Sequence, residues 1–172
     1  MKFRELAATD IEVRVNRASE YGVTLLLYKN ARTDMQILDE AVGAENWQRE
    51  HYECKGNLFC RVGIKCDGDW VWKADCGVES NAEAQKGEAS DSFKRACTNW
   101  GIGRSLYTSP EIKIAASRCN IKEKRGKKTC YDNFFVEAIE ITDGKITALA
   151  IRNEDMKDKS GAPIRCFAWR KS

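Results

Sequence analysis

The stretch KGEASDSFKRACTNWGIGRSLY, residues 86–107, has side chains whose type and spacing could bind a phosphate backbone. Its apolar residues recur at helical spacing and predict one buried helix face. These apolar residues are Phe93, Ala96, Cys97 and Trp100. Cations lie away from that face at Lys86, Lys94 and Arg95, and Arg104 follows the helix exit. Lysine and arginine on a rigid helix neutralise phosphates without reading sequence, whereas the alternative is a surface helix whose cations only meet water.

A second group of candidate residues comes from a predicted hairpin. Asp67-Gly68 separates two strand-like runs and predicts a tight turn, so that cross-strand neighbours share a face. The side chains on this face would be Arg61, Lys65, Trp70 and Trp72. A strip of cations and aromatic rings could follow a nucleic-acid backbone and stack bases. The alternative, which we favour for Trp72, places the tryptophans under the helix and the cations at the edge.

The sequence offers little for catalysis. It contains no Walker-type phosphate loop, no complete dinucleotide fingerprint and no serine or zinc hydrolase motif. His51 is the only histidine, and the eight cysteines form no CxxC pair, so neither a histidine-dependent triad nor a zinc site is indicated. We therefore expect a binding protein with no catalytic residue, no metal ligand and no cofactor.

The elements that position these residues follow from the apolar periodicity. Residues 3–18 are predicted to be helical and residues 23–28 to form a buried strand. A capping-box pattern at Thr33–Gln36 predicts a helix that ends at Gly43, with Arg32 just ahead of its start. The strands predicted next are 46–54, 58–66 and 70–76, and a second capping box at 80–83 opens the central helix. This order predicts an α+β fold with an antiparallel β-β-β-α core, a meander with a helix packed across it.

The C-terminal part is predicted to be a β extension. Residues 118–128 are strongly basic and are expected to form a mobile loop that could contact phosphates. Residues 134–142 and 145–152 predict a hairpin, and residues 164–169 a last strand. We expect a single domain over residues 1–172, with a core at about 5–108 and the extension at about 109–172.

Composition limits the class of protein. The chain has 172 residues, 42% of them hydrophobic, and a net charge of +3. That charge permits nucleic-acid binding only if the cations are clustered. No apolar run approaches the roughly 18 residues of a membrane span, and the first residues lack the apolar segment of a signal peptide. We therefore expect a cytoplasmic protein without a membrane partner.

The helix KGEASDSFKRACTNWGIGRSLY resembles the signature of the Rad52 family of single-strand annealing proteins, in its bacterial and phage form. Upstream, DMQILDEAVGAENW and LFCRVGIKCDGDWVWKADCGVES are similar to the helix–Gly–Trp segment and the central hairpin of that family. The resemblance covers roughly residues 5–108. Thr98 and Ala44 depart from the eukaryotic pattern, in which a further cation and an aromatic residue stand.

This resemblance implies a function and a set of site residues. Family members form homo-oligomeric rings or arcs, bind single-stranded DNA in a groove and pair complementary strands without ATP, in homologous recombination and double-strand break repair. Arg32, Lys94 and Arg95 match the groove cations, Lys86 matches another cation of the signature, and Arg104 matches the bacterial helix exit. The partners implied are single-stranded DNA, its complement, further copies of the chain and a host or phage single-strand binding protein.

Two other functions remain open at this point. The first is a non-catalytic module that binds RNA or acts as a scaffold. The second is a small nuclease that uses Asp or Glu with magnesium, although no spacing of acidic residues singles out such a pair. Competition between DNA and RNA, and magnesium-dependent cleavage of DNA, would separate these functions from annealing.

Overall fold

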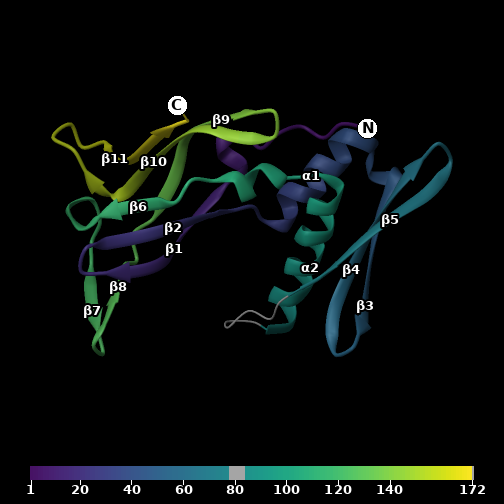
Figure 1. The fold of residues 1–172 in the computed structure, drawn as a ribbon, viewed down its shortest axis with the longest axis horizontal. Coiled ribbons are helices and arrows are strands. Elements are labelled where there is room, and N and C mark those ends of the chain that lie inside the picture. The colour runs from purple at the N-terminus through teal and green to yellow at the C-terminus, as the bar shows by residue number, and fades with distance from the viewer. Residues whose placement is uncertain (78–83, 172) are drawn as a thin grey trace. The chain divides into compact units, whose positions relative to one another are not determined.

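The computed structural model describes the backbone of residues 1–77 and 84–171, with side chains for 1–77 and 87–171. The chain forms two compact units, whose elements are drawn in Figure 1. Unit 1 comprises Met1–Glu5 and Lys29–Arg104, and unit 2 comprises Leu6–Tyr28 and Ser105–Ser172. Antiparallel sheets combine with two α-helices, which confirms the predicted α+β class. None of the described helices is both long and apolar enough to cross a membrane.

Unit 1 is a three-stranded meander with a helix packed on one face, which is the predicted β-β-β-α arrangement. Its elements are α1 (Ala31–Val42), η2 (Ala44–Asn46), β3 (Trp47–Cys54), β4 (Asn57–Cys66), β5 (Asp69–Cys76) and α2 (Ala84–Trp100). Strand β4 lies between β3 and β5, and α2 packs on β4 and β5. Lys65 lies opposite Trp70 and Gly63 opposite Trp72, as the hairpin prediction requires. The capping box predicted at 80–83 lies outside the described residues.

The core of unit 1 lies between the meander and α2. Alternate residues of β4 share one face, and the predicted apolar stripe of α2 covers it. The fully buried side chains of this layer are Cys60, Val62 and Ile64 from β4 and Phe93, Ala96 and Cys97 from α2. Trp47 stacks on Phe93 with 6.1 Å between ring centroids. Trp100 is only half-buried, and its Nε1 donates to the Val62 carbonyl oxygen at 3.0 Å.

Helix α1 begins earlier than the capping-box pattern predicts. Asn30 is the N-cap, and its side chain accepts a hydrogen bond from the Thr33 backbone N–H at 3.0 Å. The predicted start at Thr33 is therefore wrong, because asparagine caps at least as well as threonine and stands one turn earlier. Arg32 consequently lies inside the first turn of α1 instead of ahead of it. Gly43 ends the helix as predicted, with a φ of 85° that favours glycine.

Unit 2 is a six-stranded sheet in the order β11-β10-β9-β1-β2-β6, with a separate two-stranded hairpin. The six strands are β1 (Glu12–Ser19), β2 (Gly22–Tyr28), β6 (Ile112–Ala115), β9 (Phe134–Thr142), β10 (Lys145–Lys157) and β11 (Pro163–Arg170). Short 3-10 helices are η1 (Ala8–Asp10), η3 (Arg104–Thr108) and η4 (Ala116–Arg118). The predicted hairpin and last strand are present as β9, β10 and β11. Strands from both ends of the sequence share this sheet, so the expected core of residues 5–108 is divided between the two units.

Two predicted segments in unit 2 are wrong. Residues 3–18 were expected to be helical, but residues 12–18 of that range belong to β1, which pairs with β2. Val13 and Val15 alternate with Glu12 and Arg14, and this period of two with β-branched residues outweighs the weak helical spacing. Residues 118–128 were expected to form a loop, but strands β7 (Lys122–Lys124) and β8 (Lys127–Thr129) pair there. This hairpin has few apolar residues, so hydrophobic alternation could not reveal it.

Candidate nucleic-acid interface

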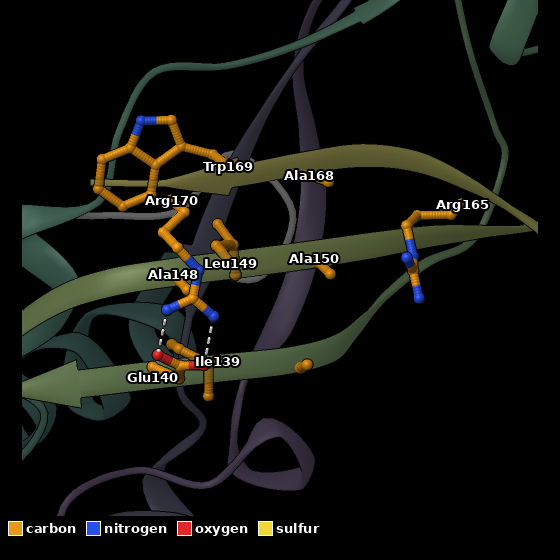
Figure 2. Close-up of a pocket in the computed structure, with 10 residues that line it drawn as sticks. Ile139, Glu140, Ala148, Leu149, Ala150, Arg165, Ala168, Trp169 and Arg170 are labelled. Atoms are coloured by element: carbon orange, nitrogen blue, oxygen red, sulfur yellow. Dashed lines mark hydrogen bonds and ion pairs between the residues drawn. The ribbon is translucent and has the colours of Figure 1, made fainter. Parts of the chain in front are cut away.

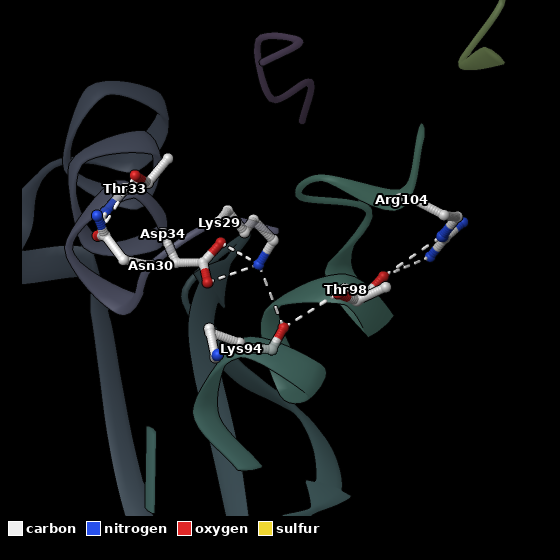
Figure 3. A network of polar contacts seen from close by, with 7 residues as sticks. All are labelled: Lys29, Asn30, Thr33, Asp34, Lys94, Thr98 and Arg104. Carbon is white, nitrogen blue, oxygen red and sulfur yellow. Dashed lines mark hydrogen bonds and ion pairs between the residues drawn. The ribbon is translucent and has the colours of Figure 1, made fainter. Parts of the chain in front are cut away.

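A buried ion pair lies where α1 meets α2 in unit 1, as Figure 3 shows. Lys29, just before α1, places its Nζ 2.5 and 2.6 Å from the two carboxylate oxygens of Asp34. Lys29 is 5% exposed and Asp34 is fully buried. The same Nζ donates to the Lys94 carbonyl oxygen on α2 at 3.4 Å. One lysine therefore joins the first turn of α1 to the middle of α2.

A further cation, Lys94, lies close to this buried ion pair. Burial raises the pKa of the Asp34 carboxyl from 3.8 to about 6, while the positive charges of Lys29 and Lys94 act in the opposite direction. The Asp34 carboxylate is therefore ionised at neutral pH, in contact with Lys29. The Lys94 carbonyl oxygen accepts from the same Lys29 Nζ that binds Asp34, so Lys94 lies beside the first turn of α1.

Arg32 and Lys94 thus both border the first turn of α1, and we refer to them as the α1–α2 cations. Arg32 is exposed, two residues before Asp34, and Lys94 is half-buried on α2. Within the described part of the chain, neither side chain makes a hydrogen bond or an ion pair with another residue. A helix N-terminus also favours anions. These two cations can therefore offer their charge to a phosphate group.

The other predicted cations near α2 have partners within the protein. Arg95 forms an ion pair with Asp75 of β5, with 3.2 Å between Nε and Oδ1. Arg104 donates from Nη2 to the Thr98 and Asn99 carbonyl oxygens at 3.0 and 3.2 Å, at the C-terminal end of α2 (Figure 3 shows the contact to Thr98). Arg104 therefore satisfies the last carbonyls of the helix, in addition to any contact it makes with a ligand. Lys86 lies in the first turn of α2, and its side chain is outside the described residues.

Arg61, Lys65, Trp70 and Trp72 form the basic-aromatic strip. Their face of β4 and β5 is the one away from α2, because β4 turns Cys60, Val62 and Ile64 toward that helix. The Arg61 guanidinium lies 4.6 Å from the centroid of the Trp72 ring. Trp70 and Trp72 have centroids 6.2 Å apart, and Trp70 is 40% exposed. The sequence-based preference for Trp72 under the helix is therefore wrong, since Trp72 packs over Gly63 on the outer face.

Within the basic-aromatic strip, Arg61 already has partners in the protein, which limits its ability to bind a ligand. Arg61 forms hydrogen bonds with a Glu50 carboxylate oxygen, at 2.9 Å from Nε and 2.6 Å from Nη2. Its charge is therefore shared between Glu50 and the Trp72 ring. Lys65 is exposed, with no ion pair among the residues that the structure describes. The part of the strip open to a ligand is Lys65 with the exposed Trp70 ring.

Unit 2 contains a shallow hollow over β9, β10 and β11, shown in Figure 2. Small residues form much of its lining, among them Ala148, Ala150 and Ala168. Arg170 at its rim makes two bonds to the Glu140 carboxylate, at 2.6 and 2.8 Å, which Figure 2 draws. This arginine is therefore already paired, unlike the α1–α2 cations.

Thiols and metal ligands give no further site among the described residues. All eight cysteines are free, and five of them are buried. Burial raises the pKa of the Cys60 and Cys166 thiols to about 11, so they are protonated at neutral pH. Within residues 1–77 and 87–171, no group of three or more His, Cys, Asp or Glu side chains is placed to hold a metal ion.

The residues that sequence reasoning missed are Lys29 and Asp34. A lysine directly after a buried strand and an aspartate five residues later carry only a weak signal, because such residues are usually exposed. The N-cap at Asn30 was the available clue, since it places Asp34 in the first turn of a helix.

An exposed aromatic ring and unpaired cations on a helix-covered meander are features of proteins that bind nucleic-acid backbones without reading sequence. Residues 4–125 match the family described as Rad52/22 family double-strand break repair protein, and the chain belongs to that family. The resemblance to the Rad52 family is therefore confirmed, and the chain is a member of a DNA repair family. Searches of curated proteins and of solved structures give no match.

Proposed function

We propose that this protein binds single-stranded DNA on unit 1 and anneals complementary strands without ATP, in recombination and double-strand break repair. The family membership gives the class of process. The observation that carries the proposal is the position of Arg32 and Lys94, which come from two helices and border one turn with no acidic partner of their own among the described residues.

The chemistry of annealing fits such a site. Two strands repel each other through their phosphates, so a protein that pairs them must neutralise charge and leave the bases accessible. The α1–α2 cations supply charge on rigid helices, and the Lys29–Asp34 pair holds those helices together. Trp70 and Lys65 on the outer face of the meander can stack a base and contact its phosphate. None of these steps requires a nucleophile or a bound nucleotide.

The proposal includes self-association and the cytoplasm as the place of action. Strands β3 and β5 are edges of the meander, and β11 and β6 are edges of the larger sheet. Exposed edges favour pairing with another copy unless they are covered. An oligomeric ring or arc would repeat the α1–α2 cations once per subunit, so a modest net charge per chain would suffice. In this proposal both units belong to one annealing domain, residues 1–172.

The test is a double variant of the α1–α2 cations, Arg32→Gln with Lys94→Gln. The matched control is Lys2→Gln with Lys55→Gln, which removes two exposed cations of unit 1. Each phosphate contact to a single strand adds ~0.7 to the slope of log affinity against log salt, so the slope should fall by about 1.4. Annealing of complementary oligonucleotides should slow in parallel, and circular dichroism should match the parent.

Several results would contradict the proposal. If the control variant loses as much affinity as the test variant, the effect is general charge and not this site. Tighter binding to RNA than to DNA of the same sequence would favour the RNA-binding alternative. Cleavage of labelled DNA that depends on magnesium would favour a nuclease, and a requirement for ATP would exclude the proposed mechanism.

A further inference from the structure

Strand β3 presents a row of side chains toward α2, on the face of the meander opposite the basic-aromatic strip. Trp47 and Arg49 of this row lie opposite Ile64 and Val62 of β4, which are fully buried on the α2 side. Cross-strand neighbours share a face of a sheet, so the two β3 side chains face the same helix. Because β3 is an edge strand, no other strand of the described chain pairs with it on its open side.

The Arg49 side chain lies over an aromatic ring of α2. Its guanidinium carbon is 4.8 Å from the centroid of the Phe93 ring, and Trp47 stacks on the same ring at 6.1 Å. Phe93 is fully buried, whereas Arg49 is exposed. The guanidinium therefore covers the ring on one side and is open on the side away from it.

Arg49 differs from Arg61, the arginine that lies over a ring on the outer face of the meander. The Arg61 guanidinium is 4.6 Å from the Trp72 ring centroid, but it is also bound by the Glu50 carboxylate. Within the described residues, Arg49 forms no ion pair and no side-chain hydrogen bond. A guanidinium with a ring on one side and no acid beside it is suited to stack on a second flat π system.

The position of Arg49 along α2 relates it to the α1–α2 cations. Phe93, the residue that Arg49 covers, directly precedes Lys94. Lys94 is joined through its carbonyl oxygen to Lys29, just before the first turn of α1. One segment of α2 thus carries both a cation without an acidic partner and the ring under Arg49.

We infer that Arg49 is a specificity-determining residue of the single-strand site and stacks one unpaired base on its guanidinium. The inference rests on the proposed function, because it adds a base contact to the phosphate contacts of Arg32 and Lys94. Guanidinium planes and aromatic rings stack on bases of any sequence. Stacking occupies the face of a base and leaves its Watson–Crick edge free, as annealing requires. Arg49 thereby distinguishes a strand that carries unpaired bases from any other polyanion.

The experiment measures how much of the affinity depends on bases. Anisotropy titrations with the full chain compare labelled oligo-dT with a fully abasic oligonucleotide of the same length, so the number of phosphates is equal. The ratio of the two affinities is determined for the parent, Arg49→Lys and Arg49→Gln. The matched controls are Arg17→Lys and Arg17→Gln, which change an exposed β1 arginine with no ion pair among the described residues. Both ligands meet the same protein sample, so a partial loss of folded protein does not change the ratio.

We expect each Arg49 variant to lower the ratio of oligo-dT to abasic affinity by roughly fivefold, the effect of losing one exposed stacking contact. Lysine should fail as glutamine does, because it keeps the charge without the flat guanidinium. The salt slope for oligo-dT should stay at the parent value in Arg49→Lys. The Arg17 variants should keep the parent ratio.

Three results would overturn the inference. A parent ratio near one would mean that the site does not contact bases. A ratio retained in Arg49→Lys would mean that Arg49 supplies charge alone, and equal losses of both ligands in the Arg49 variants would make it a phosphate contact or a structural residue. Failure of the proposed function is seen separately, as an unchanged salt slope in the double variant Arg32→Gln with Lys94→Gln.

Discussion

The α1–α2 cations of unit 1 and the arginines on the β9–β11 strands of unit 2 differ in whether an acid pairs with them. On β9–β11, Glu137 accepts hydrogen bonds from Arg152 and Arg165, and Arg170 is bidentate on Glu140. The acid in the first turn of α1 is Asp34, which is buried and already bound to Lys29. Arg32 and Lys94 are therefore available to a ligand, whereas the sheet arginines are neutralised by neighbours on adjacent strands.

This difference shows that residue type does not identify a phosphate site. Both units carry lysine and arginine on exposed faces. The distinguishing property is whether each cation has an acid within about 4 Å, the range in which an ion pair forms. On β9–β11 each ion pair joins side chains of different strands, whereas the α1–α2 cations have no acidic partner among the described residues. The predictions below test this contrast in order of expected effect.

The largest effect is expected from breaking the buried pair. Lys29→Met leaves the Asp34 carboxylate buried without its partner, which should lower the free energy of unfolding by about 3–5 kcal/mol. The double variant Lys29→Met with Asp34→Leu should recover most of this loss, because apolar residues can replace a buried ion pair. Urea denaturation measures both. A single variant as stable as the parent would mean that the pair does not hold α1 to α2.

The sequence allowed the fold class and much of unit 1 to be predicted, for physical reasons that can be named. The α2 stripe and the alternation along β4 bury fixed faces, and Asp67-Gly68 sets the register of the strip. These signals are local. The cations at Arg32 and Lys94 were found through the helix pattern and the family resemblance, and their role in DNA binding stays a prediction.

The remaining features depend on contacts between distant residues. Nothing local indicates that Arg95 pairs with Asp75, or that Arg104 binds the end of α2. Strand β1 pairs with β9 from the far end of the chain, and no periodicity reports such a partner. The β7–β8 hairpin is stabilised at its base by Asp132 and not by apolar alternation, so the sequence predicted a loop.

The pH dependence of stability should have opposite signs in the two units. The pKa of Asp34 is about 6 in the folded chain and near 3.8 when unfolded, so the folded state keeps a proton that the unfolded state releases. The free energy of unfolding should therefore fall as the pH rises from about 4 to about 6, by up to roughly 3 kcal/mol. Glu137 has a pKa of about 2, held low by Arg165 and Arg152. Its contribution is present above pH 4.5 and is lost as the pH falls toward 2.

The variant Asp34→Asn tests whether Asp34 causes the decline in the free energy of unfolding between pH 4 and 6, and His51→Gln is its control. Asp34→Asn should remove the decline between pH 4 and 6, whereas His51→Gln, which changes the only histidine, should leave it. Thermal unfolding across the pH series measures this. If the decline persists in Asp34→Asn, another group of unit 1 is responsible.

A smaller effect is expected from Gly63→Ala in the basic-aromatic strip. A Cβ at position 63 would lie 2.9 Å from ring carbons of Trp72, so the ring would have to move and its contact with Arg61 would change. Such crowding typically costs about 1–3 kcal/mol. Tryptophan fluorescence and urea denaturation measure the shift, and Trp70→Leu serves as a comparison that removes the exposed ring without crowding. Unchanged fluorescence in Gly63→Ala would show that Trp72 does not depend on this contact.

The smallest effect on stability, and the most direct test of the contrast, is expected from Glu140→Gln. Arg170 and Glu140 are both largely exposed, so losing their ion pair should change the free energy of unfolding little at pH 7. The released Arg170 should instead become available to DNA and add up to ~0.9 to the salt slope of duplex binding. Glu154→Gln is the matched control, since it removes one exposed acid of β10 whose side chain has no ion pair among the described residues. Both variants gain the same net charge, so only pairing distinguishes them. If they bind DNA equally, availability of a cation does not depend on its acidic neighbour, and the contrast between the two units would fail.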